Sequence, residues 1–276
     1  MPLHLQAITN DSQNSSLLAW ILQKGMDESN SIFISSDAMY FHIQRNIVDV
    51  SSNVMIGRLV YTIKHNEEQQ ALEILDLDIV LENNNPSKIR FLELREGSSD
   101  SNEYYEVETV EGGNHLEIET VNRYTESESI LGTERDVFIS VFPFELSVYQ
   151  DIDAFNKWAG ISKPIQVGET EWRVGGFSET FCMPGGMFNA KKKDDEHYSF
   201  LIGKVKSFRD VTIAFGEFNL PFVLTLVDTA LGLVPVAIGK EVFDISNLKE
   251  GCIVAMNADV KADLSRPEQF KELGSD

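Results

Sequence analysis

Alternating apolar and polar residues run through much of this chain and predict β-strands. Residues 59–63 and 75–81 both alternate in this way, and the polar segment 66–69 separates them. Two such runs across a polar turn are typical of an antiparallel hairpin with one exposed face. Residues 105–109 and 116–120 predict a second hairpin, which turns at a pair of glycines.

Other segments predict one more strand and one or two helices. Residues 89–94 indicate another strand. An apolar stripe at 17–22 lies between two serines and a glycine, and Asp151 or Asp153 can cap a second stripe that ends at Gly160. Polar caps and terminal glycines are typical of helix ends. Residues 32–50 remain open between strand and helix, because they alternate but also contain a possible helix cap.

The C-terminal third has the most regular pattern. Residues 199–205 and 211–215 predict a long strand that bends at a glycine, and 222–227 with 234–238 predict a hairpin. A short connector then leads to a last strand, in which seven apolar residues alternate from Cys252 to Leu264. This register predicts that one face of the last strand is buried. The opposite face, with Asn257, Asp259, Lys261 and Asp263, is then expected to be exposed.

This succession of a long bent strand, a hairpin, a short connector and a closing strand resembles the OB (oligonucleotide/oligosaccharide-binding) fold. The resemblance covers about residues 197–265. It concerns the fold and carries no diagnostic motif, so it implies a small barrel and leaves its ligand undefined.

Length and charge indicate two domains. A chain of 276 residues is at the upper limit for one core. The net charge is −21, with −16 in residues 1–150 and −5 in 151–276. We therefore expect a mainly β (α+β) protein with an acidic, antiparallel β-rich domain at 1–160. A linker or loop at 161–196 and an OB-like β-barrel with a polar tail at 197–276 would follow.

The same features exclude several classes of protein. Two cysteines are too few for a disulfide scaffold or a four-cysteine zinc site. No signal peptide or apolar membrane span is visible, so we expect a cytoplasmic protein without a membrane partner. Phosphate-binding loops, dinucleotide fingerprints and hydrolase motifs are absent from the sequence. We therefore expect no cofactor, and the sequence gives no indication of the oligomeric state.

Two groups of acidic residues are candidate sites. Asp76 and Asp78 share one face of a predicted strand, as in metal-dependent hydrolases and transferases, although an exposed strand face has the same pattern. In the second hairpin, a set of four glutamates projects on one face: Glu106, Glu108, Glu117 and Glu119. That face is either simply solvated or a docking surface for a basic partner.

Basic residues near aromatic residues provide a third candidate. Lys204, Lys206 and Arg209 lie close to several phenylalanines, a mixture that suits single-stranded nucleic acid. Lys261, on the last strand, is a further candidate contact for a partner of the barrel. However, residues 197–265 hold 6 basic and 8 acidic side chains, which argues against nucleic acid.

The absence of catalytic motifs favours a non-enzymatic binding or assembly protein that contacts a protein partner. Single-stranded nucleic-acid binding by the OB-like region is the first alternative. A metal-dependent hydrolase or transferase that uses an Asp/Glu pair is the second.

Overall fold

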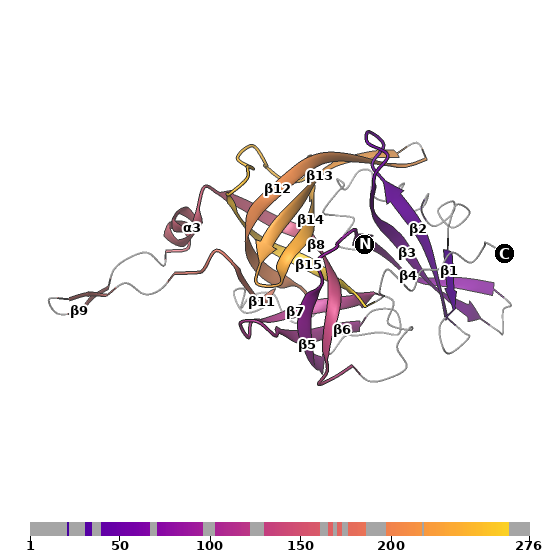
Figure 1. Cartoon of the computed structure of the whole chain (residues 1–276), viewed down its shortest axis with the longest axis horizontal. Coiled ribbons are helices and arrows are strands. Elements are labelled where there is room, and N and C mark those ends of the chain that lie inside the picture. The colour runs from indigo at the N-terminus through magenta and orange to yellow at the C-terminus, as the bar shows by residue number, and fades with distance from the viewer. Residues whose placement is uncertain are drawn as a thin grey trace.

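The computed structural model describes the strands of the chain and one helix (Figure 1). The described residues are 21, 31–34, 40–66, 71–95, 103–121, 130–160, 165–167, 170–172, 176–185, 197–216 and 218–264. The helix predicted at 17–22 lies outside them, except for Ile21. A mainly β protein is confirmed, and the ambiguous segment 32–50 contains strands at 32–34 and 40–48.

The N-terminal part forms an open sheet in chain order. Its antiparallel strands are β1 (Ser31–Ile34), β2 (Tyr40–Val48), β3 (Met55–Asn66) and β4 (Ala71–Leu81). The hairpin predicted from the first alternating runs is therefore confirmed as β3 and β4.

The remaining long strands form one sheet that closes on itself twice. The first ring contains β12 (Ser199–Phe215), β13 (Phe218–Thr229), β14 (Gly232–Gly239), β8 (Glu134–Tyr149) and β15 (Ile253–Asp263). The second ring contains the same β8 and β15 together with β7 (His115–Val121), β6 (Glu103–Thr109) and β5 (Ser87–Leu94). The pairs β14–β8 and β15–β7 are parallel and the others antiparallel. The two rings thus share one pair of neighbouring strands.

One apolar core fills both rings. Phe91 and Val107 from the second ring belong to the same cluster as Val236 and Met256 from the first. A second core lies between β3 and β4 of the N-terminal sheet and the outer parts of β12 and β13, with Leu59 and Phe222 among its members. The N-terminal sheet therefore covers part of the outside of the rings.

The strand pairing crosses the predicted domain boundary. The barrel-like ring is not built from residues 197–276 alone, because β8 comes from the predicted first domain and pairs with both β14 and β15. Within the predicted linker 161–196, β11 (Phe181–Pro184) pairs with β12. The division into domains stays a prediction. The hydrogen-bonded strands of the rings come from both sides of the predicted boundaries.

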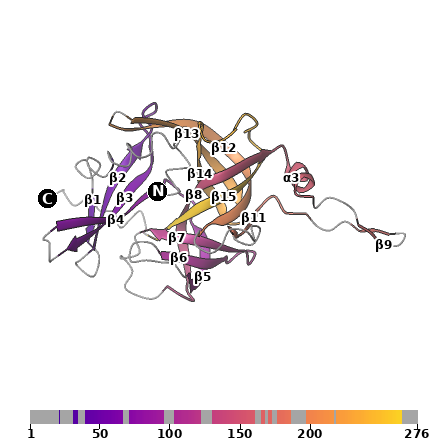
Figure 2. The same cartoon turned by 180° about the vertical axis from the view of Figure 1, so that it is seen from behind.

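The helix α3 (Ile152–Trp158) lies against the first ring, and its start is as predicted, because the Asp151 carboxylate accepts a hydrogen bond from the amide of Ala154 at 2.8 Å. After it, β9 (Ile165–Val167) and β10 (Thr170–Trp172) form a separate two-stranded sheet. Figures 1 and 2 both show β9 beyond α3, away from the rings. We call residues 161–175, which contain this hairpin, the arm.

None of the helical residues described in the structure belongs to a helix long and apolar enough to cross a membrane.

Candidate functional site

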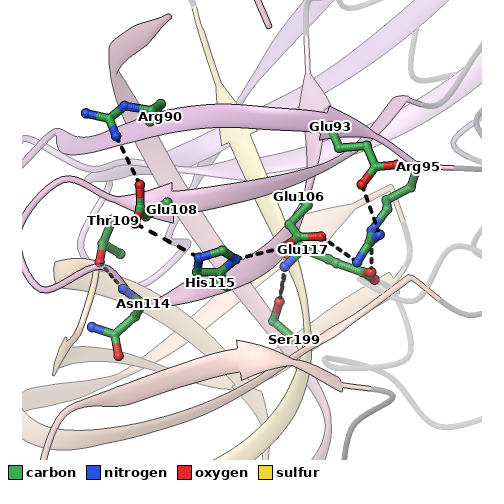
Figure 3. Close-up of polar contacts among 10 residues, drawn as sticks. All are labelled: Arg90, Glu93, Arg95, Glu106, Glu108, Thr109, Asn114, His115, Glu117 and Ser199. Carbon is green, nitrogen blue, oxygen red and sulfur yellow. Dashed lines mark hydrogen bonds and ion pairs between the residues drawn. The ribbon is translucent and has the colours of Figure 1, made fainter. Parts of the chain in front are cut away.

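The four predicted glutamates lie on the outer face of the second ring, as the hairpin register requires. Glu106 is the cross-strand partner of Glu117, and the neighbouring Val107 and Ile118 are buried in the core. Figure 3 shows that side chains of β5, β6 and β7 meet on this face. Like charges opposite each other on adjacent strands are destabilising unless cations lie between them.

Cations from the same protein surround these glutamates (Figure 3). The Arg95 guanidinium lies 2.7 Å from a Glu106 oxygen and 2.9 Å from a Glu117 oxygen. Arg90 contacts Glu108 at 3.2 Å, and a ring nitrogen of His115 lies 2.7 Å from Glu106. The face is therefore a mixed ionic network, in which the protein's own cations already contact three of the glutamates.

The fourth glutamate belongs to a different, buried group. Glu119 contacts the ammonium of Lys261, which also lies 2.7 Å from an Asp78 oxygen and 3.5 Å from an Asp259 oxygen. Asp76 is partly buried and lies near enough to Lys261 to act on its charge. We call these five residues, Lys261, Glu119, Asp78, Asp259 and Asp76, the Lys261 cluster. The cluster joins β4 of the N-terminal sheet to β7 and β15 of the second ring.

Burial and mutual repulsion change the protonation of this cluster. Desolvation, reinforced by the charge of Asp78, raises the pKa of Asp76 to about 9. Desolvation and the neighbouring aspartates raise the pKa of Glu119 to about 8, against the attraction of Lys261. Desolvation lowers the pKa of Lys261, but the surrounding carboxylates outweigh it, and the net shift is well upward. Lys261 is thus held in its charged form, while burial favours the protonated forms of Asp76 and Glu119.

The exposure predicted for the last strand was wrong. Asp259, Lys261 and Asp263 are 3%, 3% and 1% exposed, because both faces of β15 are covered. The apolar face lines the ring core as predicted, and the N-terminal sheet covers the polar face. Arg58 of β3 reaches Asp263 at 2.6 Å, so each buried charge on this face has an ionic partner.

The sequence separated residues that the fold brings together. Asp76 and Asp78 were grouped as one candidate, and Glu119 and Lys261 belonged to two others. The parallel pairing of Lys261 with Glu119 could not be read from the alternation of either strand. The sequence did not show that Asp259 and Arg58 take part in these ionic contacts. The only signal for Asp259 was a charged residue within a long, mostly apolar strand, because a charge that is buried there needs a partner.

Asp76, Asp78 and Glu119 have carboxylate oxygens within 4.8 Å of one another, close enough to surround a metal ion. However, the Lys261 ammonium already contacts two of these carboxylates. A divalent cation would have to lie beside this buried positive charge, and the residues therefore do not fit a metal site well. The metal-dependent alternative stays a prediction.

The basic residues of β12 lie on the surface. Lys204 contacts Glu179 and Lys206 contacts Asp228, both at 2.9 Å, while Arg209 is exposed. The ring of Phe208, next to Arg209, is 41% exposed. Acidic neighbours thus offset two of the three cations proposed to contact nucleic acid.

The cysteines are poor nucleophiles. Cys182 and Cys252 are buried, and desolvation raises the pKa of the Cys182 thiol to about 12. A thiol with this pKa is almost wholly protonated at neutral pH, and the thiolate is the reactive form.

Comparison with models of known protein families, with curated proteins and with solved structures finds no match for this chain.

Proposed function

We propose that this protein is a non-enzymatic binding or assembly protein that acts through protein–protein contacts. The arm carries this proposal. Its strands β9 and β10 pair only with each other among the described strands. A two-stranded hairpin is marginally stable by itself in water. A hairpin that projects from the body is therefore suited to packing against another molecule.

The ionic groups of the structure support the non-enzymatic part of this proposal, because the candidate acidic residues are engaged in contacts within the protein. The glutamate face contacts Arg90, Arg95 and His115, and Lys261 is enclosed by carboxylates. These charges stabilise the contacts between strands. A cytoplasmic location, which was expected from the sequence, is part of this proposal.

Removal of the arm tests the proposal. Residues 161–175 would be replaced by a short Gly-Ser linker, and the full chain and the variant would be used to capture partners by cross-linking and mass spectrometry. A Phe208→Ser variant is the matched control, because it removes an exposed ring elsewhere. We expect the full chain and the control to capture a partner protein, which can be a second copy of the chain. The variant without the arm should capture no such partner. Equal capture by all three proteins, or capture by none, would contradict the proposal.

The first ring supports a second candidate function. We propose that it is an OB-like barrel whose fifth strand is β8, since the long strand β12 pairs with both β13 and β15. Such barrels often bind single-stranded nucleic acid. The acidic partners of Lys204 and Lys206 weaken this candidate. Binding of a fluorescent single-stranded oligonucleotide that persists at physiological salt would favour it, and binding that disappears there would exclude it.

A further inference from the structure

We propose that the arm of one copy of this protein packs on the aromatic surface around Trp158 of a second copy, and that the contact is reciprocal. This inference rests on the function proposed above, because it names the partner of the same arm. It is carried by the composition of the aromatic surface, by its position beside the arm, and by the local charge.

An exposed aromatic surface surrounds the end of α3. Trp158 is 71% exposed, and its ring centre lies 5.7 Å from that of Tyr149 and 5.9 Å from that of Phe155. Phe155 is buried and joins this pair to further rings of the same surface, which are Phe177, Phe181 and Phe200. A tryptophan in an aromatic patch is typical of the centre of a protein interface.

The residues on either side of the arm are held together beside this surface. The Asn156 side chain donates to the carbonyl of Phe177 at 3.2 Å and accepts from the amide of Phe177 at 2.8 Å. A side chain at Gly176 would collide with Asn156, since its Cβ would lie 2.4 Å from the amide nitrogen. The described residues that precede and follow the arm therefore meet at α3, next to Trp158.

This adjacency favours a two-fold symmetric dimer. In such a dimer, each contact occurs twice, so an arm that packs on the partner's aromatic surface leaves its own aromatic surface to the partner's arm. Because the arm begins beside the aromatic surface of its own copy, the two reciprocal contacts can form one continuous interface. The arm and the partly exposed aromatic side chains together supply about twenty residues per copy, which is the lower end of the size of a stable interface.

The local charge permits contact between two copies of a strongly acidic protein. Residues 151–176 contain four acidic and three basic residues, for a net charge of −1 out of −21. Repulsion between copies is therefore weak here, whereas contacts through residues 1–150, with a net charge of −16, would bring excess negative charge together. The arm also contains the apolar residues Ile165, Val167 and Trp172, which suit an aromatic surface.

Analytical ultracentrifugation of the full chain over a range of concentrations tests this inference. We expect a dimer whose dissociation constant rises at least tenfold in Trp158→Ser and in the variant with residues 161–175 replaced. Phe208→Ser should leave it unchanged. Circular dichroism of each variant shows whether it is folded, and Trp158→Tyr provides a milder replacement that should weaken the dimer less than serine.

Disulfide trapping tests the specific contact. Copies that carry Trp158→Cys would be mixed with copies that carry Val167→Cys and oxidised, since the two native cysteines are buried. We expect mixed dimers, which form only when the two variants are combined. A full chain that is monomeric at all concentrations, or a dimer that both arm variants leave intact, overturns the inference. If the protein is monomeric but still captures another protein through its arm, only the self-association is overturned. If the protein is monomeric and the arm captures no protein, the proposed function is overturned as well.

Discussion

Replacement of Lys261 by methionine tests whether the buried cluster stabilises the contact between the N-terminal sheet and the rings. Methionine preserves most of the length of the side chain and removes the charge. Lys261 is 3% exposed, and its ammonium contacts Asp78, Glu119 and Asp259. Removing one partner of a buried ion pair costs about 3–5 kcal/mol, because the remaining charges are left without compensation. We therefore expect a loss of this size in the free energy of unfolding at pH 7.

The pH dependence gives a second measure of the same cluster. Because the pKa values of Asp76 and Glu119 are raised in the folded state, to about 9 and about 8, folding favours their protonated forms. Their contribution to stability is complete at low pH and is lost as the pH rises from about 4 towards the folded pKa values. A Glu119→Gln variant should therefore lose less stability than the unmodified protein between pH 5 and pH 8.

Denaturation by urea, followed by circular dichroism at pH 5 and pH 7, measures both effects. The Lys261→Met loss should be smaller at pH 5, where the carboxylates take up protons more easily. Lys206→Met is the control, since its ion pair with Asp228 is exposed and is worth under about 1 kcal/mol. If Lys261→Met cost no more than this control, β15 would have an exposed polar face and our description of the cluster would be incorrect.

Three further predictions concern other parts of the fold. Met256→Asp should cost several kcal/mol in a urea titration, because it places an unpaired charge in the common core of the rings; a change under about 1 kcal/mol would contradict the register. Asp49→Ala should lower stability by about 2 kcal/mol at pH 7, because Asp49 accepts hydrogen bonds from Ser52 and Thr212, and these contacts hold its pKa below the usual range. The contribution of Asp49 should fade as the pH falls below roughly 4, and a constant difference between the two proteins across that range would refute it. Cys182 should react with a thiol reagent in denaturant and only slowly in the native protein, and rapid native labelling would disprove its burial.

Hydrophobic alternation was sufficient to predict most strands. The hairpins of β3 with β4 and of β6 with β7 were predicted correctly. The alternating apolar residues from Cys252 to Ala262, along β15, are buried as predicted. The helix α3 was also predicted correctly, and Asp151 is the one of its two candidate caps that caps it. These features depend on residues that are close in the sequence, and local patterns report such contacts well.

The exposure of the second face of β15 could not be predicted in the same way. Alternation shows that two faces differ in polarity, but a polar face can be solvated or can form buried ion pairs. Here Asp259 and Lys261 lie beneath the N-terminal sheet, whose Asp78 is a distant residue in the sequence. The ring closures were missed for the same reason, because β8 comes from the predicted first domain and its pairing with β15 is long-range. Long-range pairing depends on the whole arrangement of strands and has no local signature.

The shared pair β8–β15 determines when the protein can fold during synthesis. Both rings require β15, which is the last strand of the described chain, and its parallel contact joins Glu119 to Lys261. These two residues are about 140 positions apart, and contacts of such separation form slowly. A nascent chain that has not yet released residues 253–263 from the ribosome therefore leaves neighbouring edges of β7, β8 and β12 unpaired. Such edges favour aggregation, so efficient production of this protein should depend on chaperones that bind the chain until translation reaches β15.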